Sequence, residues 1–181
     1  LAMGGLTDGV STRDMDNAFS VFPNGGVYRQ ARTYTKVENS KGEVILDNTR
    51  EDSVAVKDTT AYYINSMLTN VVTSGGGTEA RISGMTTAGK TGTTDTKDNR
   101  WFVGYTPYYT AVWVGYNNPE RISSSNNPAV SMWKKVMAPI HEGLADRKFP
   151  QVSGLVSVSY CMDCGGEAIE ACQYDARGSS R

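Results

Sequence analysis

The chain has 181 residues, of which 39% are apolar and 20% are charged, and its formal net charge is −1. That length is enough for one domain with a sizeable core. No run of Lys or Arg stands out, so the sequence offers no electrostatic surface for nucleic acid or an anionic membrane. No stretch approaches the roughly 20 apolar residues of a spanning helix. Because the first residue is Leu1, we expect an internal piece of a longer protein.

A helix and a hairpin are predicted at the start of the chain. Ser11 can cap a helix whose apolar residues recur at helical spacing until residues 23–26, Pro-Asn-Gly-Gly, end it. Residues 27–46 are rich in Tyr, Thr and Val, and a turn at residues 39–42 divides them. This pattern predicts an extended hairpin.

A second helix and two strands are predicted in the middle of the chain. The helix begins at Asp58 or Thr59, and the glycine-rich residues 74–77 end it. Its buried stripe consists of apolar residues three or four positions apart: Ala61, Ile64, Leu68 and Val71. Farther on, Trp101–Tyr105 and Thr110–Tyr116 carry apolar residues on both faces, which predicts interior strands covered on two sides.

The third predicted helix begins at Asn127, which can cap it, and has Pro128 in its first turn. Pro139 lies inside the helical pattern, so we expect a kink or an early break there. The buried stripe of this helix is made of apolar residues at helical spacing: Val130, Trp133, Met137, Ile140 and Leu144.

The composition changes after Pro150, so we predict one domain over residues 1–150 and a C-terminal extension over residues 151–181. Val152–Tyr160 alternates Val and Ser as a short strand does. All three cysteines follow, and two of them form a C-x-x-C pattern. A closed zinc site needs about four Cys or His ligands, and the single histidine lies upstream, so a disulfide with one cysteine left over is favoured for an extracytoplasmic chain.

Residues 84–91 fit G-x-x-x-x-G-K-[ST], the P-loop of nucleotide hydrolases. A P-loop needs a buried strand before it and a helix directly after Lys90. The residues before Gly84 do not form an apolar strand, and those after Thr91 are poor helix formers. We therefore predict a strand here and keep a P-loop nucleotide hydrolase as the alternative.

A strand through Lys90 places Lys90 and Gly92 on one face and Thr91 and Thr93 on the other. Gly92 has no side chain, so an extended peptide can lie close along the strand and extend the sheet. The charge of Lys90 suits a carboxylate or a developing oxyanion, and the threonine hydroxyls can bond the same groups. The simpler alternative is an exposed strand with a solvated lysine.

Around this strand the chain resembles the transpeptidase domain of class A, bifunctional penicillin-binding proteins. The resemblance lies in AGKTGTTDTKDNRWFVGYTPYYTAVWVGYNNP, GGLTDGVSTRDMDNAFSVFPNGG and MLTNVVTSGGGTEAR, and it covers residues 1–144. It implies an α+β, penicillin-binding and serine β-lactamase-like fold, with an antiparallel sheet flanked by helices, present only as its C-terminal part. It also implies peptidoglycan stem peptides and β-lactam antibiotics as partners, no metal or organic cofactor, no nucleic acid, and a parent that is anchored in the membrane and faces outward.

The family's chemistry is acyl transfer through a serine ester, with the motifs S-x-x-K, S-x-N and K-T-G. By resemblance, Lys90 orients and polarises within the site, while Thr91, Gly92 and Thr93 bind the substrate. The hydroxyls of Thr91 and Thr93 bind the donor's terminal carboxylate, and the Thr93 amide completes the oxyanion hole. In the family's tail two cysteines flank a Ser-Gly pair. Here Cys164 replaces that serine, which leaves Cys161 and Cys172 as the disulfide candidates.

Two further matches to family motifs are interpreted as coincidences. Ser131–Lys134 reads S-x-x-K and Ser124–Asn126 reads S-x-N, but both follow K-T-G, which is the wrong order. Ser131 also falls opposite the apolar stripe of its helix, where water would surround it. We therefore expect the nucleophile, its lysine and the middle motif upstream of Leu1. The isolated chain would then be inactive, and its partner would be the missing N-terminal half of the domain. A penicillin sensor or wall-binding module of the same fold is the non-enzymatic alternative.

Overall fold

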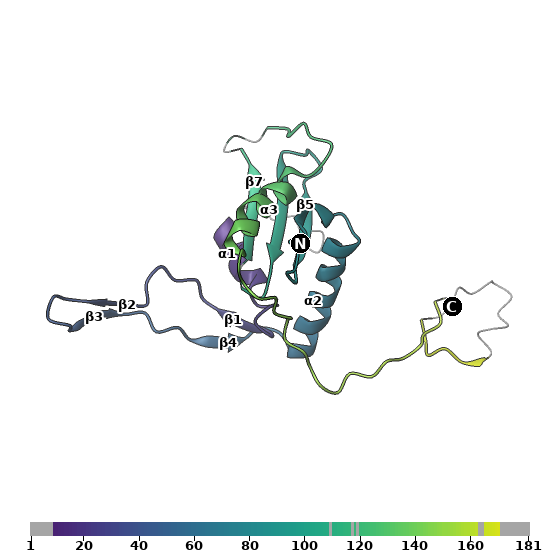
Figure 1. The fold of residues 1–181 in the computed structure, drawn as a ribbon, viewed down its shortest axis with the longest axis horizontal. Helices are drawn as coiled ribbons and strands as arrows, with labels where there is room; N and C mark the ends of the chain where they lie inside the picture. The colour runs from purple at the N-terminus through teal and green to yellow at the C-terminus, as the bar shows by residue number, and fades with distance from the viewer. Residues whose placement is uncertain (1–8, 109, 117, 119, 163–164, 171–181) are drawn as a thin grey trace. The chain divides into compact units, whose positions relative to one another are not determined.

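The structure, a computed structural model, describes residues 9–108, 110–116, 118, 120–162 and 165–170, and only the backbone of residues 110–115. The chain divides after Gln151 into two compact units. All named helices and strands of the described residues belong to the first unit (Figure 1). The interpretation of the second unit as a family-type extension stays a prediction.

The first unit combines helices with antiparallel strands that occur in runs, as the α+β prediction requires. In chain order the elements are α1 (Thr12–Phe19), β1 (Val27–Arg29), β2 (Lys36–Glu38), β3 (Val44–Asp47), β4 (Asp52–Val54), α2 (Asp58–Thr73), the 3-10 turn η1 (Thr78–Ala80), β5 (Ala88–Thr93), β6 (Asn99–Tyr105), β7 (Thr110–Gly115) and α3 (Pro128–Ile140). The first helix begins as predicted, because the Asp14 amide donates to Ser11 Oγ at 3.1 Å.

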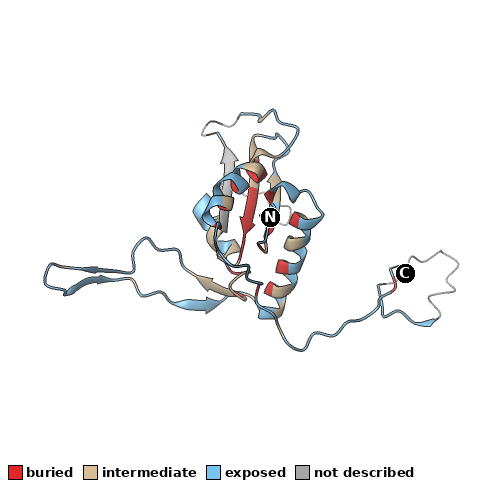
Figure 2. Ribbon diagram, in the orientation of Figure 1, coloured by how far each residue is buried: buried red, intermediate tan, exposed pale blue. Residues whose placement is uncertain are grey.

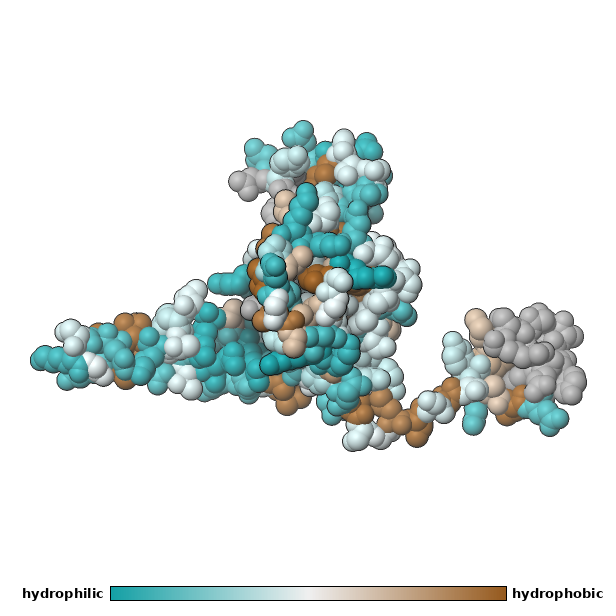
Figure 3. All heavy atoms as spheres, in the orientation of Figure 1, coloured by the Kyte–Doolittle hydropathy of each residue, from teal (hydrophilic) through white to brown (hydrophobic). Residues whose placement is uncertain are grey.

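The predicted hairpin over residues 27–46 is only partly correct. Strands β2 and β3 pair antiparallel around a turn at residues 39–43, but β1 pairs with β4, so two short ladders replace one long hairpin (Figure 1). The β2–β3 pair buries no side chain. Figure 3 shows its apolar residues as brown patches among hydrophilic neighbours, and Val44, Ile45 and Leu46 are each at least half exposed.

Helix α2 begins at Asp58, as predicted, but its buried face differs from the predicted stripe. Ala61, Asn65 and Val72 are the buried residues of this helix. Asn65 can be buried because its amide is satisfied at both ends: Nδ2 donates to the Phe22 carbonyl at 2.9 Å, and Oδ1 accepts from the Tyr105 hydroxyl at 2.8 Å.

Strands β5, β6 and β7 form an antiparallel sheet in that order, with β6 in the centre. Figure 2 shows most of β6 in the colour of buried residues, and Phe102 and Tyr105 are fully buried. Both strands predicted after Thr93 are confirmed as strands. However, β7 lies at an edge of the described sheet and not in its interior, and its side chains fall outside the described ones.

Helix α3 packs on the sheet through Trp133. The indole Nε1 donates to the Gly104 carbonyl at 2.9 Å, and the ring meets Phe102 edge-to-face at 5.5 Å between centroids. Asn127 caps the helix as predicted, since its Oδ1 accepts from the Ala129 amide at 3.0 Å. The early break at Pro139 is also confirmed, because the helix ends one residue later.

The last two members of the predicted α3 stripe are exposed, which contradicts the prediction. Ile140 is 46% exposed, and Leu144, which lies beyond the end of the helix, is 39% exposed. The residues that are buried come from the first three turns: Ala129, Val130, Trp133 and Met137.

The described residues of the tail form no strand over Val152–Tyr160, so that prediction is wrong. Val156 and Val158 are 79% and 68% exposed, and among the described residues of the tail the only pairing is an isolated bridge between Tyr160 and Glu167. Alternation alone cannot make a strand without a partner to bond its backbone. Within the described ranges, no helix has both the length and the apolar character needed to cross a membrane.

Candidate functional site

The Lys90-Thr91-Gly92 sequence lies in a strand, so the P-loop alternative is wrong. Lys90 to Thr93 are all within β5, and no helix follows Thr91 directly. The register pairs Lys90 with Val103 and Gly92 with Trp101. The intervening residues Thr91 and Thr93 pair with Phe102 and Arg100.

The two faces of β5 follow from this register, because directly opposed residues of an antiparallel pair share a face. Thr91 and Thr93 lie on the face of Phe102 and Arg100, which is the face that Trp133 covers. Lys90 and Gly92 lie on the opposite face, with Trp101. A Cβ added to Gly92 would stand 3.1 Å from Trp101 Cβ, so the glycine also makes room for that neighbour.

Lys90 is exposed and carries an uncompensated charge. Its Nζ donates to the carbonyl of Thr91 at 2.8 Å. None of the ion pairs among the described residues includes Lys90. A cation held against its own strand, without a carboxylate, is available to an anion that binds along that strand.

The outer edge of β5 has no partner in the described part of the chain. Among the described strands β5 pairs with β6 alone, so one row of its backbone N–H and C=O groups is bonded to no other strand. Such an edge can bond an extended peptide as an added strand. The lysine and the two threonines are therefore placed beside a backbone template for a peptide.

A tight turn fixes the end of β5 next to Thr93. The Thr94 hydroxyl donates to Asp98 and accepts from the Asn99 amide at 3.1 Å, while Lys97 adopts a positive φ of 60°. Hydrogen bonds from Thr94, and then from Thr96 and Asn99, lower the pKa of Asp98 from 3.8 to about 2. The turn is thus held by an ionised carboxylate across the ordinary pH range.

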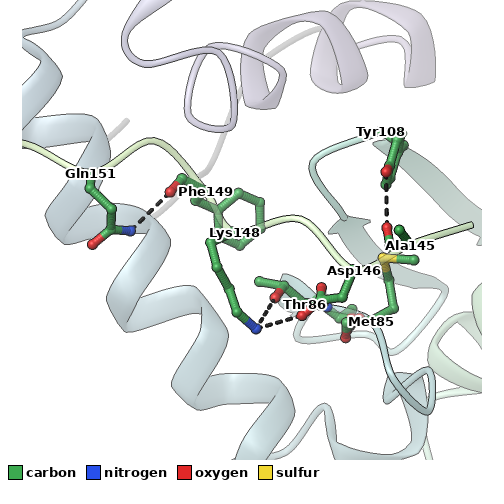
Figure 4. A network of polar contacts seen from close by, with 9 residues as sticks. Met85, Thr86, Tyr108, Ala145, Asp146, Lys148, Phe149 and Gln151 are labelled. Atoms are coloured by element: carbon green, nitrogen blue, oxygen red, sulfur yellow. Dashed lines mark hydrogen bonds and ion pairs between the residues drawn. The ribbon is translucent and has the colours of Figure 1, made fainter.

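A segment after α3 fixes the start of β5, and sequence analysis did not identify it (Figure 4). Asp146 Oδ1 accepts from the Thr86 amide at 2.7 Å, and Lys148 Nζ donates to the Thr86 hydroxyl at 3.0 Å. The hydrogen bond from Lys148 and the bond from the Thr86 amide lower the pKa of Asp146. Phe149 packs against Tyr105 at 5.4 Å, in a buried cluster with Ala88, the first residue of β5. The lysine strand is therefore anchored from residues about 60 positions away.

The two coincidental motif matches do not form a nucleophilic site. Ser131 is half-buried, not surrounded by water as expected, and its hydroxyl donates to the Pro128 carbonyl at 3.2 Å within α3. Lys134 is exposed, and no bond joins it to Ser131 among the described contacts. In the S-x-N match, the carbonyl of Ser124 accepts from Arg100. Neither serine is placed beside a base.

The predicted disulfide lies largely outside the described residues. Cys161 is buried, with its amide bonded to the Gly166 carbonyl at 2.9 Å, whereas Cys164 and Cys172 are not described. No group of three or more metal-ligating side chains occurs in the described ranges.

Comparison with known proteins gives consistent matches. The family model of the penicillin-binding protein transpeptidase domain matches residues 1–138. Penicillin-binding protein 1A of Clostridium perfringens (strain ATCC 13124) is 38% identical over 175 residues, which cover 95% of this chain and 21% of that protein. The chain spans about one-fifth of the length of the curated relatives that it matches.

Solved structures agree with this match. The penicillin-binding protein PonA1 of Mycobacterium tuberculosis superposes with a TM-score of 0.66 at 25% identity, covering 78% of this chain and 41% of that one. The D,D-transpeptidase domain of a peptidoglycan glycosyltransferase from Eggerthella lenta gives a TM-score of 0.57 at 27% identity, covering 71% and 31%. With its α+β architecture and its K-T-G strand at a sheet edge, the chain therefore belongs to the family of penicillin-binding protein transpeptidase domains, of which it carries a part.

Proposed function

We propose that this chain supplies the K-T-G wall of a serine D,D-transpeptidase site in a longer, bifunctional penicillin-binding protein. In that parent a serine attacks the D-Ala-D-Ala carbonyl of a peptidoglycan stem, and an amine of a neighbouring stem takes the acyl group to form a cross-link. β-Lactam antibiotics mimic the donor and leave the serine blocked. The observation that carries the proposal is the position of Lys90: it is exposed, has no ion pair among the described residues, and lies on a strand whose outer edge pairs with no other described strand.

Different residues of β5 bind different parts of the donor. The open backbone edge bonds the stem peptide as an added strand, and Gly92 leaves room for its close approach. Lys90 supplies positive potential to the reacting centre. The hydroxyls of Thr91 and Thr93 bind the terminal carboxylate, and the Thr93 amide provides one of the two oxyanion-hole donors.

The nucleophilic serine, its lysine and the S-x-N motif come from a part of the parent outside these 181 residues, and this missing half of the domain is the chain's first partner. A second apolar stripe on α3 supports such a partner. Met132, Val136 and Ile140 follow one another at intervals of four residues and are 47%, 49% and 46% exposed. This row adjoins the buried stripe, so the apolar surface of α3 is wider than its described neighbours cover and leaves area for another partner to bury. The isolated chain has no catalytic activity of its own.

The parent is anchored in the membrane and works on its extracytoplasmic side, where peptidoglycan is assembled. A disulfide between Cys161 and Cys172 suits that compartment. The proposed chemistry uses neither a metal nor an organic cofactor, and no nucleic acid takes part.

Labelling with a fluorescent penicillin tests the proposal directly. The parent protein becomes covalently labelled, whereas the isolated 181-residue chain does not. Peptide mapping of the labelled parent finds the label on a serine outside this chain. Labelling of Ser131 in either protein would refute the assignment of the nucleophile.

The role of Lys90 is tested by Lys90→Ala in the parent. Removing a preorganised electrostatic group from an acyl-transfer site typically costs about 100-fold or more in rate, and we expect a loss of that order in the acylation rate constant. Lys134→Ala is the matched control, because it removes an exposed lysine that lies in the coincidental motif. Equal rates for the Lys90 variant and the control would remove Lys90 from the site.

A further inference from the structure

Arg100 is a buried cation without a counter-ion beside the K-T-G strand. It is 8% exposed and is the only Lys or Arg among the described residues that is classed as buried. No carboxylate forms an ion pair with it in the described ranges. Its Nη2 donates to the Ser124 carbonyl at 3.4 Å, and its Nε is buried with no hydrogen-bond partner among the described residues. Burying a charge with so little compensation is costly, so an anion that binds near Arg100 would be stabilised by it.

The remaining contact of Arg100 is with a residue of the proposed site. Its Nη1 donates to Thr93 Oγ1 at 3.5 Å, across the pair that joins β5 and β6. A guanidinium can only donate, and a threonine hydroxyl has one proton and two lone pairs. When Thr93 accepts from Arg100, its own proton is directed to another acceptor. Thr93 is exposed, so that acceptor can be a bound ligand.

The ligand chemistry that fits this arrangement is a carboxylate. A carboxylate accepts hydrogen bonds and cannot donate them, so it matches a hydroxyl that is held as a donor. It also brings the negative charge that Arg100 lacks. Lys90 lies on the opposite face of β5, so the strand edge between them is flanked by a cation on each face. Long contacts of this kind can shorten when a ligand binds.

We propose that Arg100 is a positioning residue that holds the Thr93 hydroxyl as a donor and makes the site select acyl donors with a free terminal carboxylate. This inference rests on the proposed function. It differs from a purely structural role, in which Arg100 would merely tie residue 124 to β6. If Arg100 had only a structural role, its removal would slow acylation equally for ligands with and without a free carboxylate.

The test compares two ligands in the parent protein: benzylpenicillin and its methyl ester. Acylation rate constants are measured for wild type and for Arg100→Gln. A hydrogen bond to a charged group is strong enough that its loss should slow acylation by the free acid about 10- to 100-fold. Acylation by the methyl ester should slow by less than about threefold, because the ester has no negative charge and a hydrogen bond to a neutral group is weaker. The acid-to-ester ratio of the rate constants also controls for folding, because partial unfolding lowers both rate constants by the same factor.

Three further variants sharpen the result. Arg121→Gln removes an exposed arginine and should leave the acid-to-ester ratio unchanged. Arg100→Lys keeps the positive charge but lacks the planar set of guanidinium donors, so its acid-to-ester ratio should lie between those of wild type and Arg100→Gln. In a Thr93→Val background, Arg100→Gln should have little further effect on the ratio, because the group that it positions is gone.

Two results would overturn the inference while leaving the proposed function intact. One is an equal loss for acid and ester in Arg100→Gln. The other is an undiminished effect of Arg100→Gln in the Thr93→Val background. A wild-type parent that benzylpenicillin does not acylate would instead refute the proposed function, and the inference with it.

Discussion

At Gly104 a single added methyl group should disturb the packing of α3 on the sheet. A Cβ built there would stand 2.4 Å from Phe102 Cε1 and 2.7 Å from Trp133 Cε2. Carbon atoms in contact are normally 3.5–4.0 Å apart, so both rings would have to move by about 1 Å. Neither ring has room, because both side chains are completely buried. Gly104→Ala should therefore displace α3 from the sheet.

The expected size of the effect follows from two contributions. Overpacking a filled core costs typically 1–3 kcal/mol. Displacing Trp133 also weakens its 2.9 Å hydrogen bond to the Gly104 carbonyl, which is worth about 1 kcal/mol. The sum is about 2–4 kcal/mol in the free energy of unfolding. For a domain of this size it corresponds to a fall of roughly 5–10 °C in Tm.

Thermal unfolding followed by tryptophan fluorescence measures this change, and Gly76→Ala is the matched control. Gly76 has no atom within 4 Å of an added Cβ and no positive φ, so its variant should keep the wild-type Tm. If Gly104→Ala proves as stable as Gly76→Ala, the close packing of Phe102 and Trp133 over Gly104 is refuted.

Two other variants test the supports of the site. Asn65→Ala leaves the buried Tyr105 hydroxyl without its acceptor and should lower the free energy of unfolding by about 2–3 kcal/mol. Asn70→Ala, on the exposed side of the same helix, is the control and should lower it by less than about 1 kcal/mol. Equal losses in the two variants would contradict the role of Asn65. Asp98 has a pKa lowered from 3.8 to about 2, so its bond with Thr94 stabilises the fold above about pH 4 and is lost as the pH falls towards 2. In Asp98→Asn, unfolding midpoints measured from pH 5 to pH 2 should fall less steeply than in wild type, and an identical pH profile would exclude Asp98 as a contributor.

Local signals predicted most of the elements that position the site. Ser11 and Asn127 cap helices where the sequence indicates, because a cap is formed by residues within three positions of each other. The strand through Lys90 was predicted for the same kind of reason, since threonine and glycine after a lysine disfavour the helix that a P-loop needs. Once a strand is predicted, its alternation places Lys90 and Gly92 on one face and Thr91 and Thr93 on the other.

Contacts between distant segments could not be predicted in this way. The bonds from Asp146 and Lys148 to Thr86 join residues about 60 positions apart, and nothing in either local sequence points to the other. Arg100 is different, because a short turn connects its strand to β5. The predicted pairing of adjacent strands could have placed Arg100 near Thr93, but its burial and its missing counter-ion appear only in three dimensions.

The failed prediction for Ile140 has a physical explanation of its own. Helical periodicity identifies apolar residues that need cover, but it cannot say which neighbour provides it. On α3 Trp133 packs against the sheet and Met137 is buried, while Met132, Val136 and Ile140 form an adjoining row and remain about half exposed. Leaving all three in water forgoes the stabilisation of burial, about 25 cal/mol per Å² of apolar surface. The exposed row of α3 that contradicts the prediction for Ile140 is therefore the surface that the proposed missing half of the domain would cover, and covering it would stabilise the complete domain.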